Sequence, residues 1–301
     1  MIAVEKIDTF SGHRDCVYAL SSGTAPQEFF SAGGDGMVVR WNLHKPDLGE
    51  LFAQVKASVY AIQLDHARNQ LWVGQNFEGI HLIDVATKQA IKSLKITASA
   101  IFDIQFFQNS AFVALGDGTI VVIDIDTFSV RKHIKASDKS ARCIAVNPHA
   151  KEFAVGYSDG FIRVFGLENF EMRYVIWAHS NSVFALQYSP DYKILLSGSR
   201  DAHLKSWNVW DNYELSYQVA AHLFAINHLS FSPDGSRFVS CSMDKSIKVW
   251  DSTRLKLLKV IDKARLAGHG TSVNKVLWTH FNNLMVSCSD DRKISVWKIT
   301  E

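Results

Sequence analysis

The stretch AHLFAINHLSFSPDGSRFVSCSMDKSIKVWD, residues 221–251, decides the fold because three other stretches repeat its plan. A histidine stands 28 residues before a tryptophan, a serine stands 10 before it, and an aspartate stands 6 before it. Four residue types that keep fixed offsets indicate one structural unit repeated along the chain. The four complete sets are His13, Ser31, Asp35 and Trp41; His179, Ser197, Asp201 and Trp207; His222, Ser240, Asp244 and Trp250; and His269, Ser287, Asp291 and Trp297.

Three degenerate units fill the interval between Trp41 and Trp207. They lack the histidine and the serine, so the polar set is replaced as a whole by apolar residues. Successive tryptophan positions are then 42, 40, 42, 42, 43 and 47 residues apart, which is the period of a four-stranded propeller blade. The tryptophan position is held by Ile83, Ile123 and Phe165, and the serine position by Val73, Val113 and Val155.

The strand pattern within each unit agrees with this period. Alternating apolar runs such as SVFALQYS, ILLSGS and LKSWNV predict β-strands, and Asp-Gly pairs such as that in GGDGM predict two-residue hairpin turns between them. No segment shows sustained helical periodicity, and the chain has only five prolines and no Gly- or Ser-rich linker. We therefore expect one all-β domain over residues 1–301.

The composition excludes several classes of protein. The chain has 32 Lys and Arg against 30 Asp and Glu, a net charge of +2, which disfavours a dedicated nucleic-acid binder. No apolar run is long enough for a membrane-spanning helix, and the N-terminus shows no signal-peptide pattern. Four scattered cysteines show no zinc-ligand spacing, which predicts free thiols in a reducing compartment and a cytoplasmic protein.

These residues resemble the WD-repeat β-propellers over essentially the whole chain, although the literal Trp-Asp pair occurs only at Trp250 and Asp251. The resemblance implies seven four-stranded antiparallel blades, in which each histidine bonds the turn aspartate and the serine, and the serine reaches the tryptophan indole. A catalytic site would appear once rather than four times, so we interpret the sets as structural tetrads. No catalytic, metal or cofactor motif is present in the sequence.

The last unit ends four residues after Trp297 and is one strand short. Residues 1–10 precede the first histidine and have no strand of their own unit to join. We expect them to supply the outer strand of the last blade and so to close the ring.

The start of each first strand is expected to line the mouth of the central channel. These positions lie 23 residues before the tryptophan, or 21 in the third unit: Tyr18, Tyr60, Phe102, Arg142, Phe184, Asn227 and Asn274. Aromatic rings offer a large rigid contact area to a partner, and Arg142 would complement an acidic group. The alternative is that the rings only plug the channel and that Arg142 stacks on them. Residues before the turn aspartates extend the predicted surface: Arg200, Met243 and Asp290.

The sequence thus predicts a non-catalytic scaffold that binds a peptide or a partner protein at the channel mouth. It would be a monomer or a subunit of a larger complex, without nucleic-acid or membrane partners. The alternative is a propeller that binds a small molecule at the aromatic mouth. The longest unit also holds a basic segment, RLKLLKVIDKARLAG at residues 254–268, predicted to form an outer strand or loop that either contacts an acidic partner or protects an exposed edge.

Overall fold

The computed structural model describes residues 2–300, and these form seven four-stranded antiparallel sheets with almost no helix. The all-β, seven-bladed propeller fold is therefore confirmed. Two compact units divide the chain: Met1–Gln75, His81–Ile91 and Asn227–Glu301 form the first, and Asn76–Ile80 and Lys92–Ile226 form the second. A single domain over 1–301 stays a prediction.

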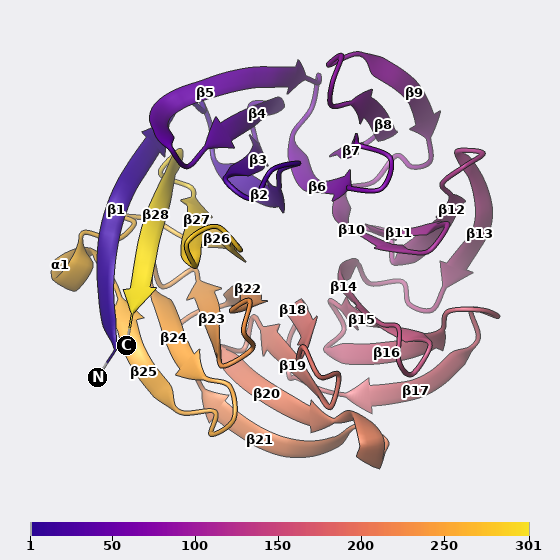
Figure 1. Cartoon of the computed structure of the whole chain (residues 1–301). Coiled ribbons are helices and arrows are strands. Elements are labelled where there is room, and N and C mark those ends of the chain that lie inside the picture. Colours follow the sequence, from indigo (N-terminus) through magenta and orange to yellow (C-terminus); the bar gives the residue numbers. More distant parts are fainter. Residues whose placement is uncertain (1, 301) are drawn as a thin grey trace. The chain divides into compact units, whose positions relative to one another are not determined.

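The first unit holds four of the sheets (Figure 1). In three of them the chain runs through neighbouring strands in order, and in the fourth the first strand of the chain joins the last three. Residues 79–80 and 92–95 of its second sheet cluster with the other unit. The strands are β2 (Val17–Ser22), β3 (Glu28–Gly33), β4 (Met37–Asn42) and β5 (Lys45–Gln54); β6 (Val59–Asp65), β7 (Gln70–Gln75), β8 (Gly79–Asp84) and β9 (Ala90–Lys95); β22 (Ile226–Phe231), β23 (Arg237–Ser242), β24 (Ile247–Asp251) and β25 (Leu257–Ile261); and β26 (Val273–Trp278), β27 (Leu284–Ser289), β28 (Lys293–Thr300) and β1 (Ala3–Ser11).

The second unit holds the other three sheets, built on the same plan. A 3-10 turn, η1 (Val209–Asp211), joins the last two strands of its third sheet. The strands are β10 (Ile101–Phe107), β11 (Ser110–Leu115), β12 (Thr119–Asp124) and β13 (Ser129–Lys135); β14 (Ala141–Asn147), β15 (Glu152–Tyr157), β16 (Phe161–Gly166) and β17 (Met172–Trp177); and β18 (Val183–Tyr188), β19 (Ile194–Ser199), β20 (His203–Asn208) and β21 (Glu214–Ala220).

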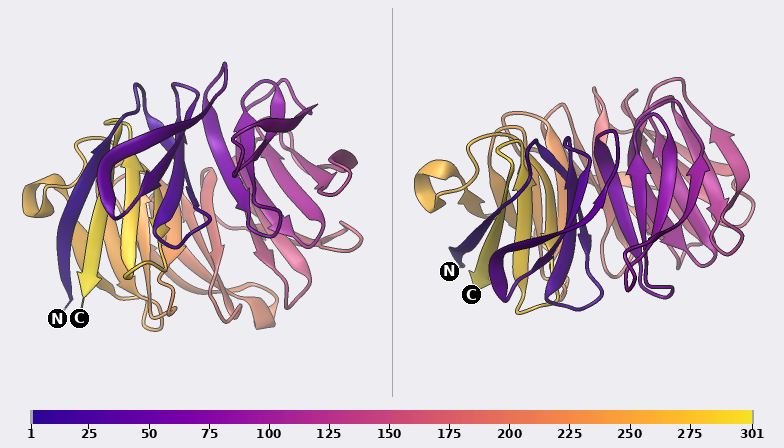
Figure 2. Two further views of the ribbon diagram at one scale, coloured as in Figure 1. Left: turned by 45° about the horizontal axis from the view of Figure 1, so that its top comes forward. Right: turned by 90° about the horizontal axis from the view of Figure 1, so that it is seen from above.

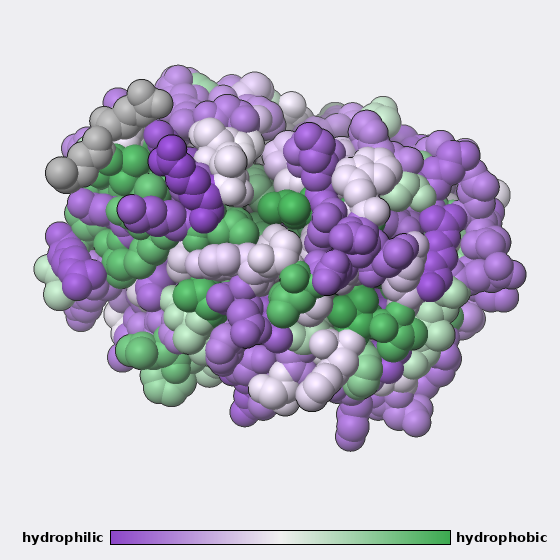
Figure 3. Space-filling model, turned by 90° about the horizontal axis from the view of Figure 1, so that it is seen from below, coloured by the Kyte–Doolittle hydropathy of each residue, from purple (hydrophilic) through white to green (hydrophobic). Residues whose placement is uncertain are grey.

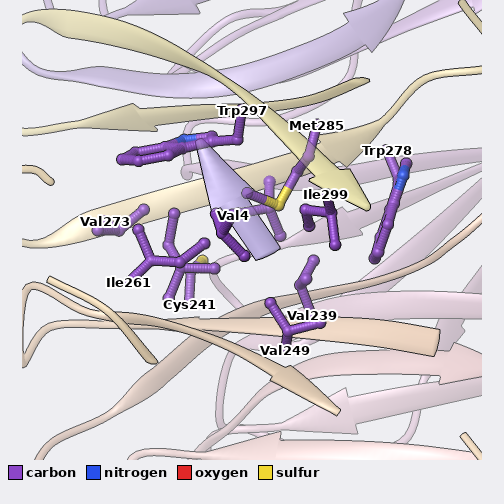
Figure 4. Close-up of a cluster of buried hydrophobic side chains, with 12 residues drawn as sticks. Val4, Val239, Cys241, Val249, Ile261, Val273, Trp278, Met285, Trp297 and Ile299 are labelled. Atoms are coloured by element: carbon purple, nitrogen blue, oxygen red, sulfur yellow. The ribbon is translucent and has the colours of Figure 1, made fainter. Parts of the chain in front are cut away.

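The N-terminal strand completes the last sheet, as predicted. β1 pairs antiparallel with β28, from Ala3 opposite Thr300 to Ser11 opposite Lys293, and the two strands lie side by side in Figure 2. Val4 of β1 lies between Trp297 and Ile299 on one side and residues of the preceding sheet on the other (Figure 4). Because β1 supplies both ladder bonds and core side chains, it closes an edge that would otherwise be open.

Buried apolar side chains fill the space between neighbouring sheets within each unit. The second strand of each sheet is almost wholly buried, as in β11, where every residue of SAFVAL is buried. In the first unit Phe10 stacks on Phe29 and Trp41, with ring centroids 5.9 and 5.4 Å apart. Each such side chain contributes about 1.5–3 kcal/mol by leaving water.

The turns between second and third strands differ from the predicted two-residue hairpins. Three residues separate these strands in six sheets, as at 34–36 between β3 and β4, and four separate β23 from β24; only one residue of each turn is left-handed. Gly36 has a φ of 70°, whereas Lys245 takes the same place with a φ of 72°. The aspartate carboxylate compensates by accepting backbone N–H groups, as Asp35 does from Met37 at 3.0 Å.

The fourth strands differ in the side chains that they carry along their free edges. Lysines stand on β9, β13 and β25, which is a common protection against unwanted strand pairing. β17 and β21 carry no lysine and expose apolar side chains, including Val175 and Leu215. On the face drawn in Figure 3, apolar patches interrupt a polar surface.

Candidate functional site

Each predicted mouth residue is the second residue of the first strand of its sheet. The residue before it is fully buried and anchors the strand, as Val17 and Val183 do. In six of these strands the pairing register shifts at this residue, so that it has no partner on the second strand. Such a bulge re-aims the side chain, which is half-buried in all seven cases.

In the second unit, Arg142 lies between two aromatic rings. Its guanidinium carbon is 3.8 Å from the ring centroid of Phe102 and 4.6 Å from that of Phe184. The planar guanidinium thus stacks on both rings, which is the arrangement that the alternative interpretation predicted. Three neighbouring strands, β10, β14 and β18, place these side chains together.

In the first unit, Tyr18 and Tyr60 meet edge to face, with ring centroids 4.9 Å apart and planes at 90°. Burial raises the pKa of Tyr18, and the nearby Cys16 adds to the shift, so its hydroxyl stays protonated at any physiological pH. Tyrosines in this arrangement offer ring faces and hydroxyl groups, and no charge.

The two predicted asparagines are tied into the scaffold. Asn274 Nδ2 donates to the carbonyl oxygen of Val17 at 2.9 Å and to Asp290 Oδ1 at 2.7 Å. Asn227 Nδ2 donates to the carbonyl oxygen of Val273 at 2.8 Å. Both amides therefore link the first strand of one sheet to the next sheet of the same unit. The sequence predicted that both asparagines bind a partner, because their amide groups can donate either to a partner or to the protein's own backbone.

The residues before the turn aspartates fall into two groups. Arg200 and Met243 are exposed, and Met243 keeps half of its surface open to solvent. Asp290 is half-buried and accepts from Asn274, while its carbonyl oxygen accepts from the Cys16 thiol at 3.7 Å. Asp290 is thus engaged within the first unit.

The tetrads are chains of buried hydrogen bonds. Trp41 Nε1 donates to Ser31 Oγ at 2.7 Å, Ser31 Oγ is 2.7 Å from His13 Nε2, and His13 Nδ1 is 3.1 Å from Asp35 Oδ2. Because a carboxylate only accepts, Nδ1–H of the imidazole donates to Asp35. Nε2 of the neutral ring then carries no hydrogen, so it accepts the serine O–H, while the serine oxygen accepts from the indole N–H. Burial lowers the pKa of His13, against the opposing effect of Asp35, so the imidazole is neutral.

The same bonds recur in the other complete units. Trp207 and Trp297 donate to their serines at 2.9 and 2.8 Å, and Trp250 donates to Ser240 at 2.9 Å. All four serines are fully buried, so none offers a hydroxyl to a substrate. Side-chain bonds from the histidine to both aspartate and serine are present for His179 and His269. The tetrads thus form bonds inside the sheets, with their serine hydroxyls closed to solvent.

The degenerate units are apolar at the matching positions. Val73, Val113 and Val155 are fully buried. Asp159 keeps its turn role by accepting from Phe161 N at 3.1 Å, and it also pairs with Arg163 at 2.9 Å. Burial opposes ionisation of Asp159, but the bonds from Arg163 and Ser137 outweigh it and lower its pKa. Ser137, which stands at the histidine position 28 residues before Phe165, and Arg163 together take the place of the histidine as its partners.

The basic segment folds differently from the prediction. Its strand, β25, is short, and the four extra residues allow a helical turn, α1 (Lys263–Leu266). Asp262 caps α1 by accepting from Arg265 N at 2.8 Å, and Leu266 packs on the cluster that contains Val4. Lys6 donates to the carbonyl oxygen of Ala267 at 2.8 Å. This insertion therefore holds β1 in place.

Sequence reasoning missed one exposed apolar pair in the second unit. Leu223 and Phe224 follow His222 in the loop before β22, with 83% and 62% of their surface exposed. In the other complete units the two residues after the histidine are polar or glycine, as with Arg14 and Asp15. Comparing these positions across the repeats would have identified the apolar pair from the sequence.

Among the residues that the structure describes, no group of three or more His, Cys, Asp or Glu is arranged to hold a metal ion. The cysteines of this part of the chain are all unpaired, and burial raises the pKa of Cys143, Cys241 and Cys288. Within residues 2–300, no helix has the length and apolar character needed to cross a membrane.

The sequence matches the family described as "WD domain, G-beta repeat" over residues 4–42, 170–208, 213–251 and 261–298. These ranges cover just over half of the chain, and each ends at or just after the tryptophan of a complete tetrad. A solved structure, the WD40 β-propeller domain of Doa1, superposes with a TM-score of 0.88 over 99% of this chain and 97% of that one, at 17% identity. That likeness concerns the fold alone.

Curated relatives are more distant and longer. The 66 kDa stress protein of Physarum polycephalum is 24% identical over 66% of this chain and 33% of its own length. Striatin-3 of Mus musculus is 24% identical over 68% of this chain and 29% of its own length. Pre-mRNA-processing factor 17 of Homo sapiens is 25% identical over 67% of this chain and 36% of its own length. The chain thus spans about a third of the length of these relatives.

Proposed function

The chain belongs to the WD-repeat family, and from that premise we propose that it is a non-catalytic protein-interaction module that binds a peptide or a partner domain at the starts of its first strands. Propellers of this family mediate protein contacts, and a repeated scaffold supports such a role by holding side chains rigidly for a partner. A cytoplasmic location, suggested by the free thiols, belongs to the same proposal.

The observation that carries the proposal is that Phe102, Arg142 and Phe184, although stacked on one another, are each only half-buried. These three residues lie at bulged strand starts, where the ladder does not dictate a side chain. They are half-buried, so rings and guanidinium keep part of their surface for a partner. Aromatic and arginine side chains are those that most often dominate binding energy at interfaces.

The geometry also narrows the site. Asn227, Asn274 and Asp290 are engaged in bonds between sheets, so we assign them to the scaffold. In the second unit the proposed contact residues are Phe102, Arg142 and Phe184 with the exposed Arg200. In the first unit they are Tyr18 and Tyr60 with the exposed Met243. A carboxylate of the partner, placed at the edge of the stacked guanidinium, would be its complement.

Affinity capture tests this proposal. Wild type, a Phe102→Ala and Phe184→Ala double variant, and a control with Met172→Ala and Val175→Ala would each serve as bait. The control removes exposed apolar groups from β17, a fourth strand of the same unit. We expect a partner that binds wild type and the control and that the double variant loses. Identical partners for all three folded baits would overturn the proposal.

A further inference from the structure

A second surface feature of the second unit is an exposed tryptophan on a short turn. Trp210 lies in η1, between β20 and β21, and 68% of its surface is exposed. Leaving an indole in water forgoes a large burial energy, so an exposed one on an ordered turn is informative. Trp210 is outside the tetrads and outside the predicted mouth.

The turn that carries Trp210 is held rigidly. Asn208 caps it by accepting from Trp210 N at 3.2 Å, and Tyr213 N donates to the carbonyl oxygen of Asn208 at 2.8 Å. Asn212 and Tyr213 are both left-handed, with φ of 49° and 63°. Such a backbone conformation costs energy in a tyrosine, so other contacts must impose it.

Those contacts reach a buried carboxylate in the neighbouring sheet. Tyr213 is buried, and its hydroxyl donates to Glu152 of β15. The Tyr188 hydroxyl lies 2.6 Å from the Tyr213 hydroxyl. The Tyr213 ring also packs edge-on against Tyr174 of β17, with centroids 5.3 Å apart. Two sheets therefore fix the turn, and a rigid aromatic side chain loses little entropy when a partner binds it.

The charges around Trp210 are acidic. Asp211 and Glu214 are exposed, and neither forms an ion pair within residues 2–300. Residues 206–226 contain no lysine or arginine. Two basic residues of this region are engaged elsewhere: Lys193, whose carbonyl oxygen accepts from Val209 N at 2.9 Å, pairs with Asp191 at 3.4 Å, and Arg173 pairs with Glu152 at 3.4 Å. The acidic pair is therefore available to a cation of another molecule.

We propose that Trp210, Asp211 and Glu214 form a second docking site, for a segment of a partner protein that bears arginine or lysine beside an aliphatic residue. The cation would lie over the indole face, because tryptophan attracts cations more strongly than the other aromatic side chains do. The two carboxylates would pair with the same cation. The aliphatic residue would cover the exposed Leu215 on the adjoining strand.

This site is independent of the proposed mouth. The start of β18, which carries Phe184, pairs with the end of β19, and the start of β19 pairs with the end of β20. Phe184 and Trp210 therefore lie at opposite ends of one sheet. A partner could occupy one site whether or not the other is used.

Fluorine NMR of the full chain labelled with 5-fluorotryptophan tests the proposal. The chain has eight tryptophans, and Trp210→Phe and Trp177→Phe variants assign the two resonances that matter. Trp177 is the matched control because it is 75% exposed in the same unit and has no carboxylate in residues 172–182. The probes are three short Gly-Ser peptides with Arg-Leu-Arg, Gln-Leu-Gln or Glu-Leu-Glu at the centre.

We expect the Arg-Leu-Arg peptide alone to shift the Trp210 resonance saturably and to leave Trp177 unchanged. An Asp211→Asn and Glu214→Gln variant should weaken binding roughly tenfold, and added salt should weaken it further. Equal shifts with the Gln-Leu-Gln peptide, equal shifts at Trp177, or no shift would overturn the proposal. A Trp210 shift that grows with protein concentration alone would also overturn it, by showing that a second copy is the occupant.

Discussion

The two units use the same position of the repeat in different ways. In the first unit, Asn227 and Asn274 turn the start of the first strand into a hydrogen-bonded tie between sheets. In the second unit, Phe102, Arg142 and Phe184 meet there by their flat faces. Hydrogen bonds from asparagine amides to backbone carbonyl groups are directional and hold the side chain in one position, whereas stacked side chains can slide over one another. The difference teaches that one repeat position can tie sheets together in one region and hold a half-buried stack in another, which is where we propose that a partner binds.

The largest effect should come from acid, because protons act on several tetrads at once. Burial lowers the pKa of His13 and His179 below the ordinary 6.5, and the pKa of Asp201 is also lowered, chiefly by its bond with His179 acting against desolvation. The folded state therefore binds fewer protons than the unfolded state, so stability is full above about pH 6.5 and falls as the pH drops below it.

Thermal melting at a series of pH values from 7.5 to 5 measures this effect. A His13→Asn variant should show a weaker pH dependence, and a His280→Gln variant, at an exposed position, should match wild type. A melting temperature that is constant or rises on acidification would contradict the neutral, buried state of the tetrad histidines.

The next largest effect is expected from replacing a tetrad serine, and one serine from each unit allows the two units to be compared. Ser197→Val and Ser287→Val each leave an indole N–H and a histidine nitrogen buried without their partner. Each should lower the free energy of unfolding by about 2–4 kcal/mol, measured by denaturant titration. The effect should be equal in the two units, because the tetrads are the same in both.

A combined variant sharpens this prediction. Adding His179→Leu and Trp207→Ile to Ser197→Val makes the set apolar, with valine at the serine position and isoleucine at the tryptophan position as in two of the degenerate units. It should cost less than the sum of its single substitutions, because no polar group is left unpaired. Strict additivity would contradict the view that the set is replaced as a whole.

Asn274→Ala should have a smaller effect, a loss of about 1–3 kcal/mol, since it breaks bonds to Val17 and Asp290. Phe102→Ala should cost less than this, because the ring is half-buried and its contacts are faces rather than bonds. Denaturant titration of the two variants compares the units directly. A greater loss for Phe102→Ala would reverse the assignment of scaffold and contact surface.

The smallest effect should come from Arg142→Lys, which keeps the charge and loses the planar stack. We expect a loss of about 0.5–1 kcal/mol in denaturant titration. Arg200→Lys, at an exposed position, is the matched control and should leave stability unchanged. Equal stability of the Arg142→Lys variant and wild type would show that the stack contributes nothing to folding.

The sequence predicted much of the fold because the offsets between histidine, serine, aspartate and tryptophan reflect a buried bond network that tolerates little change. The closure of the last sheet by β1, predicted for residues 1–10, followed from the missing fourth strand of the last unit; Met1 lies outside the described residues. The turn type was wrong, because Asp-Gly also suits a three-residue turn with one left-handed residue, as at Gly36.

The candidate site was less predictable. Spacing placed seven residues at strand starts, but it did not show which side chains the scaffold itself uses, because Asn274 reaches a carbonyl of a strand far away in sequence. Trp210 gave no signal, since its exposure depends on a turn fixed by Tyr213 and Glu152 from another sheet. Contacts between sheets, which no local pattern records, decide these roles.

The most direct test of the account measures binding of the captured partner to three purified proteins under conditions where all are folded. Wild type, Phe102→Ala with Phe184→Ala, and Asn274→Ala would be compared by isothermal titration calorimetry. The account predicts that the double variant binds at least about tenfold more weakly and that Asn274→Ala binds like wild type. Unchanged affinity of the double variant, or a loss confined to Asn274→Ala, would contradict it.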